Sequence, residues 1–203
     1  MKRTSVGLAP KSPVKLRPML LDGLFSHLHL AMASVLNSDV VCEPCEDLYA
    51  VLDEESFLEA FAFLGIGIGR YLSHPKLFAE EGESQILIHL AGRLRLADRV
   101  PTVSDLLPER ADCREHLAHA MRKNGMAYEL SADRTAATLT VSLPRFRAQK
   151  YVASEFTAEE VCKLFLRVAL MLVGAPEPSN DGEEMEARRA CAIKKGCRIE
   201  PKI

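Results

Sequence analysis

The sequence predicts a single helix-rich α+β domain with a small antiparallel sheet. Three observations support this prediction: the apolar stretch from Thr157 to Val173 has helix start and stop signals, other stretches repeat apolar residues with a helical period, and residues 126–143 have the pattern of a β-hairpin. The 203 residues are enough for one sizeable hydrophobic core. We expect a basic N-terminal arm at 1–17, a globular domain at 18–176 and a charged C-terminal tail at 177–203.

The apolar stretch that begins at Thr157 is predicted to be the central helix of the core. Thr157 and Glu160 have capping-box spacing, so each side chain can satisfy a free backbone N–H at the start of a helix. Gly174 and Pro176 are the corresponding stop signals. The second half of the stretch contains one charge, Arg167, so we expect neighbours on several sides of this helix, at residues 157–173.

Two helices are expected in the first third of the chain. Residues 18–36 carry an apolar stripe with helical spacing. Residues 53–72 begin with three acidic residues, which the dipole at a helix N-terminus favours. Gly65, Gly67 and Gly69 lie near the end of this second helix and predict a close-packing seam, a kink or the helix end.

Residues 84–97 fit two patterns. Ile86, Ile88 and Leu90 alternate with polar or small residues, as they would in a strand, but the Leu, Ala and Arg content and the helical spacing suit a helix about as well. We favour a helix here.

The best strand signal follows a further predicted helix at residues 111–123, which Asn124 and Gly125 close. Within 126–143, Leu139 and its apolar neighbours alternate with Thr and Ser, and a five-residue polar segment separates two strand-like runs. This pattern predicts an antiparallel hairpin.

A ferredoxin-like core is the alternative architecture. It would consist of a strand near residues 4–16, the first helix, the hairpin, the helix at 157–173 and a closing strand near 196–200. Residues 40–124 would then be a helical insertion.

Composition excludes several classes of protein. The chain is 48% hydrophobic and 27% charged, as is usual for a folded domain, and its net charge of −2 gives no global attraction to nucleic acid or membranes. There is no Trp, and the basic N-terminus is not followed by an apolar signal segment. No apolar run is long enough for a membrane span. The prediction is therefore a cytoplasmic protein with reduced cysteines.

Cysteine spacing leaves two readings open. Cys42 and Cys45 have the C-x2-C spacing that lets two thiolates bind one zinc ion, and Cys191 with Cys197 is the candidate second pair. The other reading is that these cysteines are unligated and partly buried. We expect no cofactor otherwise.

Histidines 27 and 29 are the candidate acid–base groups of the first helix, although residues two apart on a helix do not share a face. Residues 24–32, Leu-Phe-Ser-His-Leu-His-Leu-Ala-Met, resemble the histidine-bearing first helix of the small Cas6-type CRISPR endoribonucleases. In that family a histidine of this helix acts in RNA cleavage, so the resemblance implies a catalytic role for His29. The glycine-rich C-terminal loop of that family is absent, and we do not assign the chain to it.

Basic residues occur in three clusters of the sequence. If these clusters converge in space they would form a phosphate-contacting surface for nucleic acid; otherwise they are solvated faces. The candidate residues are Arg93, Arg95, Arg145, Arg147, Lys150, Lys194 and Lys195.

No catalytic motif is present, and the predicted function follows from that. The leading prediction is a non-catalytic adaptor or accessory subunit that acts by binding another protein. The first alternative is an RNA-binding or RNA-processing subunit of a nucleoprotein complex, and the second is a zinc-stabilised interaction domain.

Overall fold

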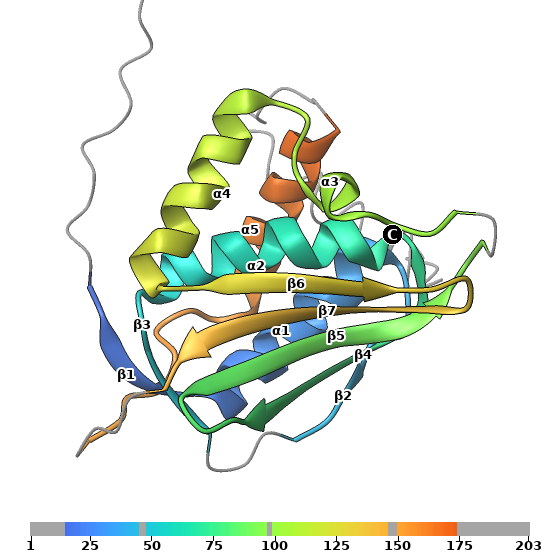
Figure 1. The fold of residues 1–203 in the computed structure, drawn as a ribbon. Coiled ribbons are helices and arrows are strands. Elements are labelled where there is room, and N and C mark those ends of the chain that lie inside the picture. Colours follow the sequence, from blue (N-terminus) through green and yellow to red (C-terminus); the bar gives the residue numbers. More distant parts are fainter. Residues whose placement is uncertain (1–14, 45–47, 97–98, 146–149, 174–203) are drawn as a thin grey trace, which may run out of the picture.

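A computed structural model describes residues 15–44, 48–96, 99–145 and 150–173 of the chain. A layer of helices covers one face of a twisted five-stranded sheet, and a separate two-stranded sheet lies at one end (Figure 1). This arrangement confirms the predicted α+β class.

Helices and strands are interspersed along the chain. In order they are β1 (Arg17–Leu20), α1 (Leu21–Leu36), β2 (Val41–Cys42), β3 (Tyr49–Leu52), α2 (Glu54–Gly69), β4 (Leu72–Glu81), β5 (Gln85–Leu94), α3 (Val103–Leu106), α4 (Ala111–Asn124), β6 (Ala127–Ala132), β7 (Ala136–Pro144) and α5 (Ala158–Leu172).

The large sheet has the strand order β2-β4-β5-β7-β6, and β1 pairs with β3 in the small sheet. Strand β2 is parallel to β4, and the other pairs are antiparallel. The predicted hairpin at 126–143 is confirmed as β6 and β7. The pairing of β4 with β5 shifts register between Ser73 and Lys76, as it does at a β-bulge.

The helix favoured at residues 84–97 is wrong, because this stretch forms β5. Strand β5 lies between β4 and β7. Its alternate residues Ile86, Ile88 and Leu90 are buried under the helices, so pairing on both edges and burial of one face outweighed the local helix propensity. The ferredoxin-like alternative is also wrong, since residues 40–124 supply β5 and α2, which lie within the core rather than in an insertion.

The prediction of a central helix at 157–173 is wrong as well. Helix α2 is the central one, with 13 of its 16 residues buried, whereas α5 buries Val161, Leu164, Phe165 and Val168 of its 15 residues. Helix α5 packs on α1 and α2 from outside. Lys163 of α5 is exposed to solvent.

Candidate functional site

Three arginines and a tyrosine surround a hollow of about 470 Å³ at one end of α2. Arg70 caps the C-terminus of α2, and Tyr71 follows it. Arg95 and Leu96 come directly after β5, and Arg99 lies in the loop before α3. These five residues line the hollow, which we call the arginine pocket.

The ring of Tyr71 holds two of the three guanidinium groups. The Cζ of Arg70 lies 5.1 Å from the ring centroid, and the Cζ of Arg99 lies 5.4 Å from it. At this separation the negative face of the ring attracts a cation. Two positive charges are therefore held close together around one aromatic ring.

Asp105, on α3, is the acidic group that organises this cluster. Its backbone oxygen accepts a hydrogen bond of 2.6 Å from Nη2 of Arg70, and its Oδ1 lies 3.5 Å from Nη2 of Arg99. The hydroxyl of Tyr71 donates to the same Oδ1 at 3.3 Å. The Oδ2 accepts from both the hydroxyl and the backbone N–H of Thr102, and these bonds lower the pKa of Asp105. Asp105 is therefore ionised at neutral pH; its carboxylate lies beside Arg99, and its backbone oxygen holds Arg70.

Arg95 is fixed by the end of the sheet. Its Nε donates to the backbone oxygen of Leu72 at 2.6 Å, and its backbone N–H donates to the oxygen of Tyr71 at 2.8 Å. A guanidinium carries five N–H donors, so the bond to Leu72 occupies one of them. Arg95 also lines a second hollow.

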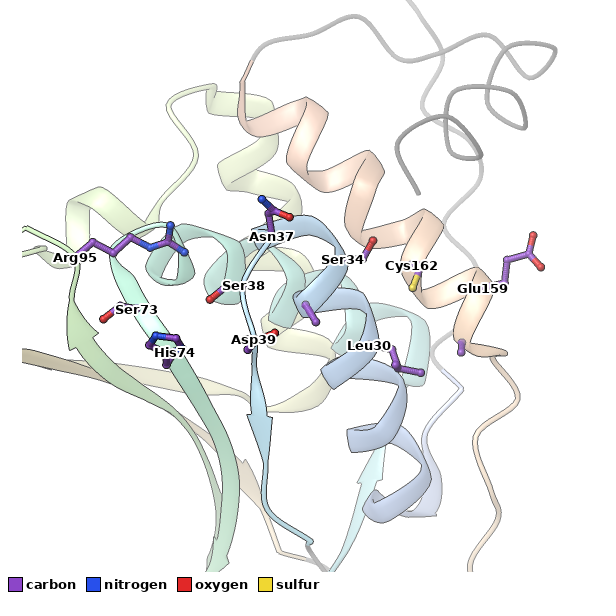
Figure 2. Close-up of a pocket in the computed structure, with 12 residues that line it drawn as sticks. Leu30, Ser34, Asn37, Ser38, Asp39, Ser73, His74, Arg95, Glu159 and Cys162 are labelled. Atoms are coloured by element: carbon purple, nitrogen blue, oxygen red, sulfur yellow. The ribbon is translucent and has the colours of Figure 1, made fainter. Parts of the chain in front are cut away.

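The second hollow, of about 970 Å³, lies between α1, the start of β4 and the first turns of α5; we call it the α1–α5 groove. Figure 2 shows Arg95, Ser73 and His74 at one end of this groove, and Leu30 and Cys162 toward the other. The full lining consists of Leu30, Ala33, Ser34, Asn37, Ser38, Asp39, Ser73, His74, Arg95, Ala158, Glu159 and Cys162.

The backbone of His74 is in an unusual conformation. Its φ is 50°, in the left-handed region that non-glycine residues seldom adopt. His74 lies within the β4 bulge, which turns its exposed side chain toward the groove. Asn37 also has a φ of 50°, but it caps the C-terminus of α1, where asparagine in this conformation is common.

The histidines of α1 lie away from both hollows. The Nε2 of His29 is 2.7 Å from the backbone oxygen of Val40, so His29 ties α1 to the segment that leads into β2. Neither His27 nor His29 lines the arginine pocket or the α1–α5 groove. The catalytic role of His29 stays a prediction that the structure does not test.

The predicted zinc ligands fall mostly outside the described residues. Cys42 is in β2, and its burial raises the pKa of its thiol, whereas Cys45, Cys191 and Cys197 are not described. In the part of the chain that the structure covers, no three His, Cys, Asp or Glu side chains are grouped so that they could hold a metal ion.

The predicted basic residues that the structure describes do not form one surface. Arg95 reaches the arginine pocket, Arg93 is exposed on β5, and Arg145 forms an ion pair of 2.5 Å with Glu81. Lys150 is exposed in a loop, and the remaining three candidates, Arg147, Lys194 and Lys195, are not described.

Sequence reasoning did not include Arg70 and Tyr71 among the site residues. Their signal was weak: a basic and an aromatic residue directly after a glycine-bearing helix. Nothing in the sequence brings this pair next to Arg95 and Arg99, because the approach depends on where β5 ends relative to α2.

Solved structures similar to this chain include the histidine kinase AdeS of Acinetobacter baumannii, with 13% sequence identity and a TM-score of 0.47 over 64% of this chain and 68% of that chain. Another is the histidine kinase domain of the blue-light-activated histidine kinase EL346 of Erythrobacter litoralis. It has 8% identity and a TM-score of 0.43 over 68% of this chain and 65% of that chain. No family model and no curated protein matches the sequence.

These similarities contradict the function predicted from the sequence. Both of these structures are histidine kinases, not adaptors, RNA-processing subunits or zinc-stabilised interaction domains, which contradicts the leading prediction and both of its alternatives. At such low identity the likeness concerns the fold alone, and the chemistry must be argued from this chain's own residues.

None of the described helices has the length and apolar character needed to cross a lipid bilayer. The cytoplasmic location and the protein partner stay predictions.

Proposed function

We propose that this protein binds a small phosphate-bearing anion in the arginine pocket. The observation that supports the proposal is the convergence of Arg70, Arg95 and Arg99 on one hollow in which Asp105 is the acidic partner of the cluster. An arginine-rich hollow is suited to phosphate because a planar guanidinium donates two parallel N–H groups to a phosphate.

The geometry leaves these guanidinium groups able to bind a ligand. The bond from Arg70 to Asp105 uses a backbone oxygen, and the bond from Arg95 to Leu72 does the same. Neither bond neutralises the charge of the arginine. Arg99 is 67% exposed and lies 3.5 Å from the Asp105 carboxylate, so this ion pair is weak and an incoming anion can compete with it.

Tyr71 and Asp105 act as the scaffold of the proposed site. Tyr71 supports Arg70 and Arg99 through its ring, and its hydroxyl bonds to Asp105. The capping box of Thr102 with Asp105 holds the carboxylate in place. A site whose cations are already positioned loses less entropy on binding than one formed by free surface side chains.

The test is isothermal titration of the purified chain with inorganic pyrophosphate at low and at high salt. We expect binding that weakens as salt rises, because the attraction is between charges near the surface. Arg99→Ala is expected to weaken binding by about tenfold or more, since a hydrogen bond to a charged group contributes about 1.5–3 kcal/mol. Arg122→Ala, which removes an exposed arginine of α4 that does not line the pocket, is the matched control and should bind like the wild type.

Equal weakening of pyrophosphate binding in Arg99→Ala and Arg122→Ala would mean that total charge, and not the pocket, governs binding. Undetectable binding of pyrophosphate by the folded wild-type chain would reject the proposal. A thermal unfolding curve of each variant verifies that it is folded before titration.

A further inference from the structure

We infer that the ligand extends from the arginine pocket past Arg95 into the α1–α5 groove, and is therefore a soluble phosphate monoester with an apolar chain. This inference rests on the proposed function, because the phosphate group is placed in the arginine pocket. It adds the part of the ligand that the arginine pocket does not contain.

Arg95 is the residue that joins the two hollows. It lines both the arginine pocket and the α1–α5 groove, and its side chain is anchored at Leu72 through Nε. The bond to Leu72 uses only the Nε–H of Arg95, so the four N–H donors on its two Nη atoms can bind ligand oxygens. A ligand that binds Arg95 is therefore at the entrance of the groove.

Apolar side chains line much of the far part of the groove, beside Ser34 and Glu159. Leu30 is 50% exposed, whereas three other leucines of α1 are buried, and it faces the groove with Ala33, Ala158 and Cys162. Burial of a methylene group against such a wall is favourable by about 0.8 kcal/mol. This part of the groove is suited to a hydrocarbon chain.

The charges of the groove set the direction of the ligand. Two carboxylates, Asp39 and Glu159, also line it; in Figure 2 Glu159 lies on α5 at the end away from Arg95, and Asp39 lies between His74 and Leu30. These carboxylates repel an anion, whereas Arg95 attracts one. The phosphate is thus directed to the Arg95 end, and the uncharged chain lies toward Leu30.

His74 adds a polar contact at the anionic end. It lies in the β4 bulge beside Ser73 and faces the same end of the groove as Arg95. A left-handed backbone at a non-glycine residue costs about 1 kcal/mol or more, and such strain is concentrated at ligand-binding positions. His74 is therefore placed to donate to a ligand oxygen that leaves the arginine pocket.

The test compares methyl phosphate with octyl phosphate by isothermal titration, with octyl phosphate kept below its micelle-forming concentration. Methyl phosphate reports on the arginine pocket, and octyl phosphate reports on both hollows. Because each buried methylene tightens binding by up to about fourfold, we expect octyl phosphate to bind at least about tenfold more tightly.

The variants Leu30→Asp and Leu16→Asp test whether the tighter binding of octyl phosphate arises in the groove. Leu30 lines the groove and is 50% exposed, and Leu16 lies outside both hollows and is 51% exposed, so the two changes are matched in exposure and in charge. Leu30→Asp is expected to remove the advantage of octyl phosphate and to leave methyl phosphate binding within about twofold. Leu16→Asp should keep the advantage.

Four outcomes would overturn the inference, and they differ in what they say of the proposed function. Equal affinities for the two phosphates, or an advantage that survives Leu30→Asp, would reject the extension into the groove while the phosphate site stands. No binding of either phosphate would reject both. Binding to vesicles of phosphatidylcholine with phosphatidic acid, without binding of monomeric octyl phosphate, would identify a membrane surface in place of a soluble ligand.

Discussion

Helices α2 and α5 are both rich in apolar residues, but α2 lies inside the fold and α5 lies at its outside. Helix α2 is enclosed by α1, α3, α4, α5 and the sheet, whereas α5 packs on α1 and α2 and keeps a charged side toward solvent. The sequence of α5 looked central because its start and stop signals are strong. The comparison teaches that capping signals define where a helix begins and ends, while its position in the fold depends on how closely other elements can approach it.

Glycines decide how closely the neighbours of α2 approach. A Cβ on Gly67 would lie 2.8 Å from the backbone oxygen of Leu106, and a Cβ on Gly69 would lie 2.4 Å from a methyl carbon of Leu36. Two of the three readings of these glycines are therefore confirmed: Gly67 and Gly69 form a close-packing seam, and Gly69 is the last residue of α2. The glycines weaken α2 as an isolated helix but let α3 and α1 pack against it.

The largest effect that follows from this comparison is expected for Gly67→Ala. The new methyl group meets backbone atoms of α3, which cannot move aside as a flexible side chain would, so we expect the free energy of unfolding to fall by about 1–3 kcal/mol. Urea denaturation monitored by circular dichroism measures this change.

Gly23→Ala in α1 is the matched control for this substitution. Nothing lies within 4 Å of a Cβ at Gly23, and alanine is favoured over glycine in a helix by about 1 kcal/mol. This variant should be more stable than the wild type. If Gly67→Ala were also stabilised, the enclosure of α2 would be less tight than described.

The amount of structure that could be predicted from sequence follows the range of the interactions involved. The start of α5 and the β6–β7 hairpin were predictable, because a capping box and an alternating pattern depend on residues a few positions apart. Strand β5 was not, since its state depends on two partner strands. The arginine pocket was not predictable either, because Arg70, Arg95 and Arg99 come from the end of a helix, the end of a strand and a loop.

A moderate effect is expected from removing the cap of α5. The hydroxyl of Thr157 accepts a hydrogen bond from the N–H of Glu160 at 3.3 Å, and the Glu160 carboxylate accepts from the N–H of Thr157 at 2.8 Å. Thr157→Ala should therefore lower the free energy of unfolding by about 1 kcal/mol, while Thr157→Ser, which keeps the hydroxyl, should lower it less. Denaturation of the two variants under the same conditions provides the measurement. Equal losses would show that the methyl group, and not the hydroxyl, stabilises the start of α5.

The smallest effect concerns the contact between α2 and its two neighbours at Glu59. The Oε2 of Glu59 is 2.9 Å from Nε2 of His116 on α4, and its Oε1 is 2.9 Å from Nη2 of Arg167 on α5. The hydrogen bond to the Glu59 carboxylate raises the pKa of His116, against the opposing effects of burial, Arg167 and Lys123. A raised pKa in the folded state means that the protonated imidazole stabilises the fold fully below the unfolded pKa of about 6.5, and that this stabilisation is lost as the pH rises through the folded pKa.

We therefore expect the free energy of unfolding of the wild type to fall as the pH rises from mildly acidic to alkaline. We expect a smaller fall in His116→Gln. His116 is 47% exposed, so solvent screening limits the difference to less than about 1 kcal/mol. The measurement is the free energy of unfolding of both proteins across this pH range, at low salt. Parallel curves for the two proteins would assign the pH dependence to other groups. A smaller slope in the variant would show that the outer helices are fastened to α2 by charge at this position, in addition to the apolar packing that encloses it.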